Sequence, residues 1–472
     1  MAVCEYCHTA VLKDADTVQN IGTVSEVIAD YSPIQLGTSG SVDGRTFSTV
    51  GRLQLRYSGG MWNEWYILFE DGSTGWLADA SGEYAVMIER KEEEKFPTFE
   101  SLAPTNNHTF FGRDYQVADV REAECVAGEG ELPFRVGSGW KARLVDLRCG
   151  NFFLTLDYSE GDRPRAYDGK ATSLRSMQCQ LLRRAEEIQA GLGQYTGNVM
   201  PLNCPACGAS VSIVPGVTTH VLCGACGAEA DTTGAVARVL EQSRSVNKMP
   251  FSLQLGAAAK IGGVEYLVLG AMRRRDGEGA AWNEYLLFAK RVGFLWLVDT
   301  PQGWMRGLEL ETWPRWTAMT RDALVGHLDF KLLYQYPATV VSAIGAFNWR
   351  VRVGDQSTVY QFKRGHEELV AEFNETELTF SRSVPVGSDQ LRAWFGAEFR
   401  EMEKIPGAGG ATDIGPFYAI VLMSGGIFLL FTFEPAFEDP LYVLPIVGLV
   451  LVALVVPAAI LEVYFQKKGS RK

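Results

Sequence analysis

The sequence repeats itself at an offset of 219 or 220 residues, and this duplication constrains the fold more than any other feature. Trp62, Asn63 and Glu64 recur as Trp282, Asn283 and Glu284. The segments 34–37 and 75–79 recur in the same way at 253–256 and 295–299. Chance does not keep one register over so many matches, so most of the chain consists of two homologous modules in tandem.

Both modules carry the signals of antiparallel β-structure. Gly44 precedes Phe47, and Gly112 precedes Tyr115, in the pattern of a hairpin turn that leads into a half-buried strand. Stretches rich in β-branched and aromatic residues predict strands at 141–147, 152–157, 339–344 and 348–353. Apolar residues at helical spacing predict a helix that closes each module, at 173–188 and 387–400.

The expected fold class is mainly β, with two tandem antiparallel β modules, an intervening zinc ribbon with four cysteine ligands, and a C-terminal transmembrane hairpin of two helices. The expected boundaries are a partial zinc-ribbon segment at 1–19, a first β module with its closing helix at 20–192, the zinc ribbon at 200–235, a second β module with its closing helix at 245–401, a linker at 402–413, the transmembrane hairpin at 414–465 and a basic cytoplasmic tail at 466–472.

Four cysteines have the spacing of a structural zinc site. Two Cys-x-x-Cys-Gly pairs, Cys204 with Cys207 and Cys223 with Cys226, are separated by fifteen residues. A redox dithiol is the alternative, which the presence of two matched pairs disfavours. His220 lies nearby, but four thiolates complete a tetrahedral shell, so we expect this histidine in a strand.

Cys4 and Cys7 resemble the second half of such a ribbon. No partner pair precedes them, so a second, partial metal site at these two residues is left open. The pair followed by His8 also matches c-type haem attachment, which the absence of an export signal disfavours.

Two apolar segments, 414–433 and 440–461, are each long enough to span a bilayer as a helix. Three acidic residues and no basic ones lie between them, whereas four basic residues follow at 467–472. By the positive-inside rule, the N-terminal modules and the C-terminal tail face the cytoplasm, at a bacterial inner membrane. A buried helical hairpin is the alternative, which the nearly unbroken apolar run at 444–461 disfavours.

Charge and motif content argue against nucleic-acid binding and against catalysis. The chain carries 44 Lys and Arg against 56 Asp and Glu, whereas nucleic-acid binders usually present a basic face. Its five histidines are scattered, and no P-loop, zincin helix or nucleophile elbow occurs. We therefore expect a protein that is not an enzyme.

The candidate binding residues are the duplicated polar positions Asn63, Glu64, Asn283 and Glu284, which could hold a small cation or the backbone of a partner. The alternative is that the asparagines cap turns and the glutamates point to solvent or bond a neighbouring strand. The duplicated tryptophans, at 62, 76, 282 and 296, are expected as core anchors rather than a ligand cage. Residues 273–275, three arginines, are expected at the solvated tip of a hairpin, with contact to anionic lipid as an alternative.

The chain resembles a bacterial family of unknown function, DUF4178. The resemblance rests on the Trp-Asn-Glu-x-Tyr-x-Leu-Phe strand, a downstream Gly-Trp-Leu, the run at 130–134, and the runs at 338–340, 347–350 and 353–355 in the second module. It covers two copies, each preceded by a ribbon, over residues 1 to about 400. The family carries no established activity. Its members are often encoded beside polyamine-synthesis enzymes and small membrane proteins, which implies a link to envelope stress or polyamine physiology.

The function expected from these features is a scaffold or adaptor that recruits protein partners at the inner membrane, because exposed sheet edges capture partners readily. The second hypothesis is a sensor whose acidic modules bind a small cationic metabolite such as a polyamine. The third is an enzyme with an unrecognised site. Structural zinc is the one cofactor expected.

Overall fold

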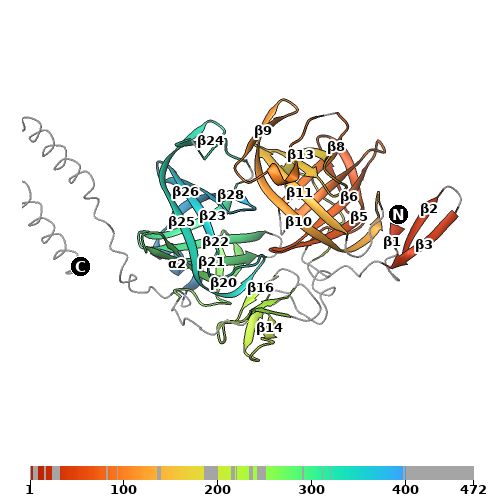
Figure 1. Ribbon diagram of the computed structural model, residues 1–472. Coiled ribbons are helices and arrows are strands. Elements are labelled where there is room, and N and C mark those ends of the chain that lie inside the picture. Colours follow the sequence, from red (N-terminus) through yellow and green to blue (C-terminus); the bar gives the residue numbers. More distant parts are fainter. Residues whose placement is uncertain are drawn as a thin grey trace, which may run out of the picture. The chain divides into compact units, whose positions relative to one another are not determined.

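The computed structural model describes residues 32–184, 200–241 and 251–399, apart from short gaps at 81–82, 93, 135–139, 214–217, 219, 233–237, 290–291, 311, 319 and 397–398 (Figure 1). It also describes strands β1 (Ala2–Val3), β2 (Thr9–Asp14) and β3 (Thr17–Thr23). The segments expected to span a membrane lie outside this part of the chain. Within it, no helix combines the length and the apolar character needed to cross a bilayer.

The first module is a closed, eight-stranded antiparallel barrel. Its strands are β5 (Arg45–Tyr57), β6 (Gly60–Phe69), β7 (Thr74–Ala80), β8 (Glu83–Arg90), β10 (Arg113–Glu131), β11 (Lys141–Cys149), β12 (Phe152–Asp157) and β13 (Arg165–Thr172). Around the barrel they follow the order β5-β6-β7-β8-β13-β12-β11-β10, and the pairing of β10 with β5 closes the ring. Short hairpin strands, β4 (Ser39–Val42) and β9 (Asn107–Phe110), precede β5 and β10, and a 3-10 turn, η1 (Phe99–Ser101), precedes β9.

The second module has the same topology. Its strands are β20 (Val264–Asp276), β21 (Ala281–Ala289), β22 (Gly293–Thr300), β23 (Gly303–Glu309), β25 (Leu328–Phe347), β26 (Gln356–Arg364), β27 (Glu367–Phe373) and β28 (Leu378–Val386). β25 pairs with β20 to close the ring, and β19 (Ala258–Ile261) and β24 (Asp322–Val325) take the places of β4 and β9. The predicted tandem of antiparallel β modules is therefore confirmed.

Glycine permits a close backbone approach at two strand pairings of the first barrel. At the β5–β10 closure Gly51 pairs with Gly130, and a Cβ on Gly51 would lie 1.8 Å from the carbonyl oxygen of Glu131. Where β13 pairs with β8, a Cβ on Gly169 would lie 1.9 Å from the carbonyl oxygen of Val86. The backbones at these two pairings approach too closely for any side chain.

The two faces of each barrel strand have different roles. Outer-face residues such as Trp65 and Ile67 are fully buried because the segments around Ile34 and Met177 cover them. The inner face lines the barrel lumen: Thr155 on β12 donates a hydrogen bond of 3.1 Å to the sulfur of Met87 on β8, past the intervening strand. Alternation along β6 places Trp62, Glu64 and Tyr66 together on the lumen face.

Two local predictions are wrong. Residues 173–184 form turns instead of the start of a helix: Gln178 and Leu181 have positive φ, and the buried Met177 packs on the outer face of the barrel. Residues 348–353 form a loop instead of a strand, because Trp349 and Val351 pack into the apolar cluster at one end of the second barrel. The other expected helix occurs as α2 (Ser388–Phe395).

Between the barrels lies the ribbon. It comprises the hairpin β14 (Met200–Asn203) and β15 (Ser210–Ile213), followed by β16 (His220–Leu222), β17 (Glu229–Asp231) and β18 (Arg238–Glu241). β16 pairs with the end of β25, and Val211 and Val221 pack against Leu269 and Phe288 of the second barrel. β1, with β2 and β3, pairs with β10 of the first barrel in the corresponding way.

Candidate functional site

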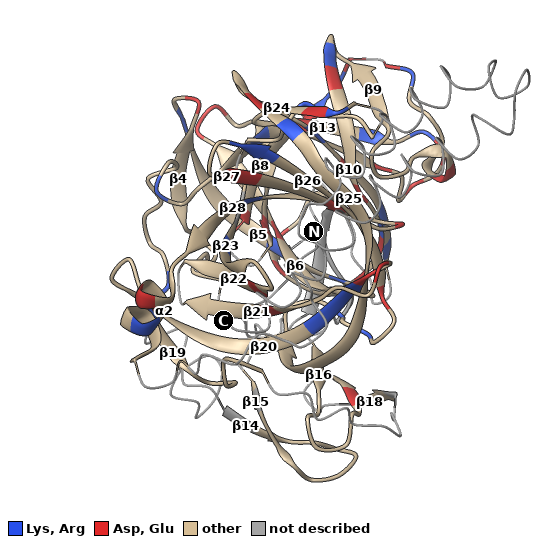
Figure 2. Cartoon of the chain, turned by 90° about the vertical axis from the view of Figure 1, so that its left-hand side faces the viewer, with Lys and Arg blue, Asp and Glu red and all other residues tan. Residues whose placement is uncertain are grey.

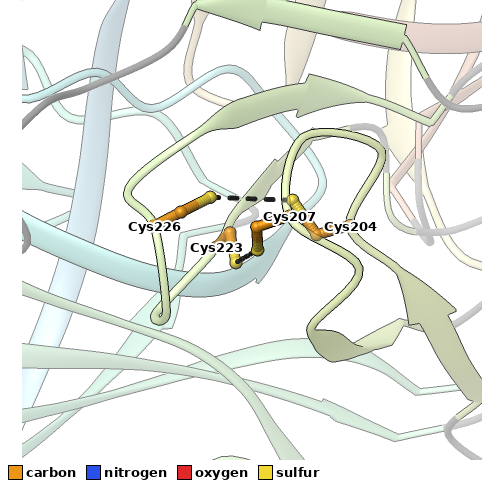
Figure 3. Close-up of side chains that lie close together, drawn as sticks. All are labelled: Cys204, Cys207, Cys223 and Cys226. Carbon is orange, nitrogen blue, oxygen red and sulfur yellow. Dashed lines mark hydrogen bonds between the residues drawn. The ribbon is translucent and has the colours of Figure 1, made fainter.

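The four ribbon cysteines come together in one cluster (Figure 3). Cys204 and Cys207 lie in the turn between β14 and β15, and Cys223 and Cys226 lie between β16 and β17. All four sulfurs lie within 4.8 Å of one another. Two sulfur pairs, Cys204 with Cys226 and Cys207 with Cys223, are separated by 3.8 Å.

The backbone of each turn prepares this arrangement. The amides of Gly208 and Gly227 each donate a 2.7 Å hydrogen bond to the carbonyl oxygen of the first cysteine of the pair. Both glycines have positive φ, which a side chain would strain. Four thiolates at about 2.3 Å around a tetrahedral ion lie about 3.8 Å apart, so the cluster has the dimensions of a metal site. Cys4 and Cys7 lie outside the described residues.

The duplicated asparagines do not cap turns. Asn63 and Asn283 are buried on the outer faces of β6 and β21, and each accepts hydrogen bonds from an arginine on the preceding strand. Arg52 Nε donates to Asn63 at 3.0 Å, and Arg273 Nε donates to Asn283 at 2.8 Å. These asparagines hold adjacent strands together and do not reach the lumen.

The duplicated glutamates face the lumen instead. Among the residues that the structure describes, the one side-chain hydrogen bond to Glu64 comes from Trp62 Nε1, at 2.8 Å. Desolvation raises the pKa of Glu64 from its ordinary 4.5 to about 8, and the carboxylates of Asp146, Asp79 and Asp157 add to this rise. A carboxyl group in this environment is largely protonated at neutral pH.

In the second barrel, the corresponding Glu284 has a cationic partner. Trp282 Nε1 again donates to the carboxylate, at 2.6 Å, and Arg274 Nη1 donates at 3.3 Å. Arg274 also contacts Glu372, at 2.7 Å, and Ser357 donates to the same carboxylate at 2.7 Å. Although desolvation opposes it, Arg274 lowers the pKa of Glu372. Figure 2 shows acidic and basic residues on the strands as well as in the loops.

The strand registers identify the matching positions in the first barrel. Leu55 pairs with Trp62 as Arg274 pairs with Trp282, so Leu55 stands where the second barrel has its arginine. Two further correspondences follow from the same registers: Asp157 matches Glu372, and Ala142 matches Ser357. The first lumen therefore keeps both carboxylates and lacks the cation that neutralises them in the second.

Arg121 faces the lumen of the first barrel, but it is engaged by other groups than Glu64. It forms an ion pair with Asp119, and its guanidinium lies 3.9 Å from the ring centre of Tyr57. Its counterpart in the second barrel is Tyr336, whose ring packs edge-on against Trp282. The strongest electrostatic influences on Glu64 come from carboxylates and not from this arginine.

The prediction that residues 273–275 form a solvated tip is wrong for Arg273 and Arg274, whereas Arg275 is exposed. Arg273 and Arg274 are buried within β20, where one points outward to Asn283 and the other inward to Glu284. Sequence reasoning also missed Asp146, Asp157 and Glu372. The repeat alone aligns Leu55 with Arg274, at an offset of 219 residues, so this difference could have been found from the sequence.

The comparisons with known proteins agree with the duplicated architecture. The family model for a domain of unknown function (DUF4178) matches two regions, residues 35–174 and 254–387. Both regions fall on the barrels described above. No curated protein and no solved structure matches the chain.

Proposed function

The chain belongs to the DUF4178 family in two copies, and from the difference between these copies we propose that it is a sensor whose first barrel binds a small cation in its lumen. The observation that carries the proposal is the replacement of Arg274 by Leu55. In the second barrel a guanidinium is held between Glu284 and Glu372. The first barrel keeps an acid at both positions, so a ligand cation would occupy the place of the arginine head group.

Electrostatics supports this assignment. An uncompensated carboxylate in a desolvated lumen is costly, and a cation that pairs with it removes much of that cost. Because Glu64 is largely protonated at pH 7 in the absence of a ligand, binding of a cation should also release a proton from it. Asp157 is one methylene shorter than Glu372, and its Oδ1 accepts a 2.9 Å hydrogen bond from the amide of Ser159, so a ligand cation would pair with its other carboxylate oxygen.

Calorimetry with methylguanidinium as probe tests the proposal on the full chain, kept in a mild detergent because of its apolar C-terminal segments. We expect one binding site, with close to one proton released at pH 7 when buffers of different ionisation enthalpy are compared. Glu64→Gln should weaken binding at least tenfold, whereas the matched change Glu284→Gln in the second barrel should leave it unchanged. Equal losses in both variants, or no heat with any small organic cation, would contradict the proposal.

We also propose zinc as the ion held by Cys204, Cys207, Cys223 and Cys226. The donor set supports this choice, because four thiolates in a closed tetrahedron favour zinc, and no position is left open for a substrate. The ribbon packs on the second barrel, so the role of the ion would be structural.

The scaffold role, the protein partners and the attachment to an inner membrane through 414–465 stay predictions, based on the sequence alone. Membrane attachment is compatible with a sensor, since a ligand bound in the first barrel would then be reported at a membrane.

A further inference from the structure

Four aromatic side chains gather at one end of the first lumen. Tyr66 and Trp76 pair across β6 and β7 with their ring centres 5.0 Å apart. Trp76 lies 6.0 Å from Phe134, which lies 5.4 Å from Trp140. All four are only half-buried, and they belong to the same apolar cluster as Leu55 and Trp62. Tyr66 follows Glu64 by two residues on the same strand face, so the aromatic cluster adjoins the acidic group.

The ribbon covers part of the corresponding end of the second lumen. Leu286, which matches Tyr66, is fully buried and packs with Leu222 of the ribbon. Phe288, which matches Leu68, is 7% exposed because ribbon residues cover it, whereas Leu68 is 42% exposed. The positions of Tyr66 and Leu68 are thus accessible to solvent where Leu286 and Phe288 are covered, whereas Trp76 and its counterpart Trp296 are both half-buried.

We infer that the cation bound in the first barrel is organic, with an amino or guanidino head group at Glu64 and an apolar arm against Tyr66, Trp76, Phe134 and Trp140; this inference rests on the proposed function. The surroundings of Glu64 fit N–H donors better than a metal ion. Calcium and magnesium require six or more oxygen ligands. Asp146 and Asp157 lie near Glu64, but Leu53, Leu55 and the N–H group of Trp62 flank it and supply no ligand oxygen.

The aromatic cluster supplies what an organic ligand requires. Half-buried ring faces bind methylene groups through the hydrophobic effect and attract a cationic head through their quadrupoles. Arg121 already occupies the faces of Tyr57 and Trp62, so a ligand would bind the rings at the aromatic end instead.

A series of n-alkylguanidinium ions, from methyl to octyl, tests the inference by calorimetry on the full chain. We expect affinity to rise about two- to fourfold for each added methylene until the arm passes the aromatic cluster. Sodium, potassium and calcium ions should not displace the octyl compound. Trp76→Ala should flatten the dependence on chain length while methylguanidinium still binds, and the matched change Trp296→Ala in the second barrel should alter neither.

The outcomes separate the two proposals. If methylguanidinium and octylguanidinium bind equally well to the unmodified chain, or if calcium displaces both, the organic class is wrong and the cation site remains. If no member of the series binds, the cation site fails as well. The comparison within the unmodified chain decides the question even if Trp76→Ala does not fold.

Discussion

Replacing Glu64 by glutamine should stabilise the first barrel, and by more as the pH rises. The pKa of Glu64 is raised to about 8 in the folded protein, chiefly by desolvation, and is 4.5 when the group is free in solution. Between these two values the folded state keeps a proton that the unfolded state releases. The stability of the first barrel therefore falls as the pH rises through this window, and it levels off above pH 8.

The magnitude follows from the same two values. The interval from 4.5 to about 8, at about 1.4 kcal/mol per pH unit, corresponds to about 5 kcal/mol in total. Because proton binding by Glu64 is linked to folding, about 3 kcal/mol of this decrease in the free energy of unfolding falls between pH 6 and pH 9. Glu64 keeps part of its surface accessible to water, which screens the effect, so we expect about 1.5 to 3 kcal/mol. Glutamine stays neutral and keeps an acceptor for Trp62, so the variant lacks this loss.

Hydrogen exchange measured by mass spectrometry on the full chain reports each barrel separately. Peptides from β5, β6 and β7 should become more protected in Glu64→Gln than in the unmodified chain, with a difference that grows from pH 6 to pH 9 after correction for intrinsic exchange. In the control, Glu284→Gln, peptides from β20 and β21 should lose protection, because the buried Arg274 loses one of its two carboxylate partners. If the pH profiles of Glu64→Gln and the unmodified chain run parallel, the raised pKa of Glu64 is refuted.

Three further predictions concern the proposed zinc site and the exchange of Leu55 and Arg274 between the two lumens. Replacing Cys223 by serine, or removing metal with a strong chelator, should abolish one equivalent of bound zinc as measured by elemental analysis. Hydrogen exchange should then increase in β16 and β25 while β5 to β8 stay protected, because the ribbon packs on the second barrel. An equal increase of exchange in both barrels would contradict this. Leu55→Arg should place a guanidinium beside Glu64 and so weaken methylguanidinium binding at least tenfold in calorimetry. The reciprocal Arg274→Leu should destabilise the second barrel by about 3 kcal/mol in denaturant unfolding, and an unchanged affinity in Leu55→Arg would contradict the assignment of the site.

The parts of this structure that could be predicted from the sequence are those encoded by local spacing. Cys-x-x-Cys-Gly contains both the ligands and the glycine that the turn requires, so the cluster of Cys204, Cys207, Cys223 and Cys226 follows from four short segments. Gly44 and Gly112 likewise lie at tight turns, after Asp43 and Phe111 with positive φ, as the hairpin pattern predicts. Closure of the barrels was not predictable in this way, because the pairing of β5 with β10 joins residues more than 60 positions apart.

The arginines of β20 show why local composition did not predict which side chains are buried inside the barrel. Three consecutive arginines followed by Asp276 have the composition of an exposed turn, and strands rarely bury such a run. In the structure, alternation sends Arg273 to the outer face and Arg274 to the lumen, and each finds its partner on β21. Each partner lies ten residues away in sequence. Asn283 is directly opposite Arg273 and Glu284 is diagonal to Arg274, so the strand register is needed to identify both contacts.

The two barrels together separate what the fold requires from what it does not. Both have the same strand order, and both keep a buried asparagine bonded to arginine on the outer face, so this outer pair belongs to the architecture. The second barrel shows that an arginine can neutralise the lumenal glutamate, and contact a second acid across the lumen, without any change of topology. In the first barrel Glu64 is desolvated without such an arginine, although the second barrel shows that the fold can accommodate one. A destabilising group that the architecture does not need is best explained by a ligand that supplies the missing charge, and Leu55 marks the place where that ligand would sit.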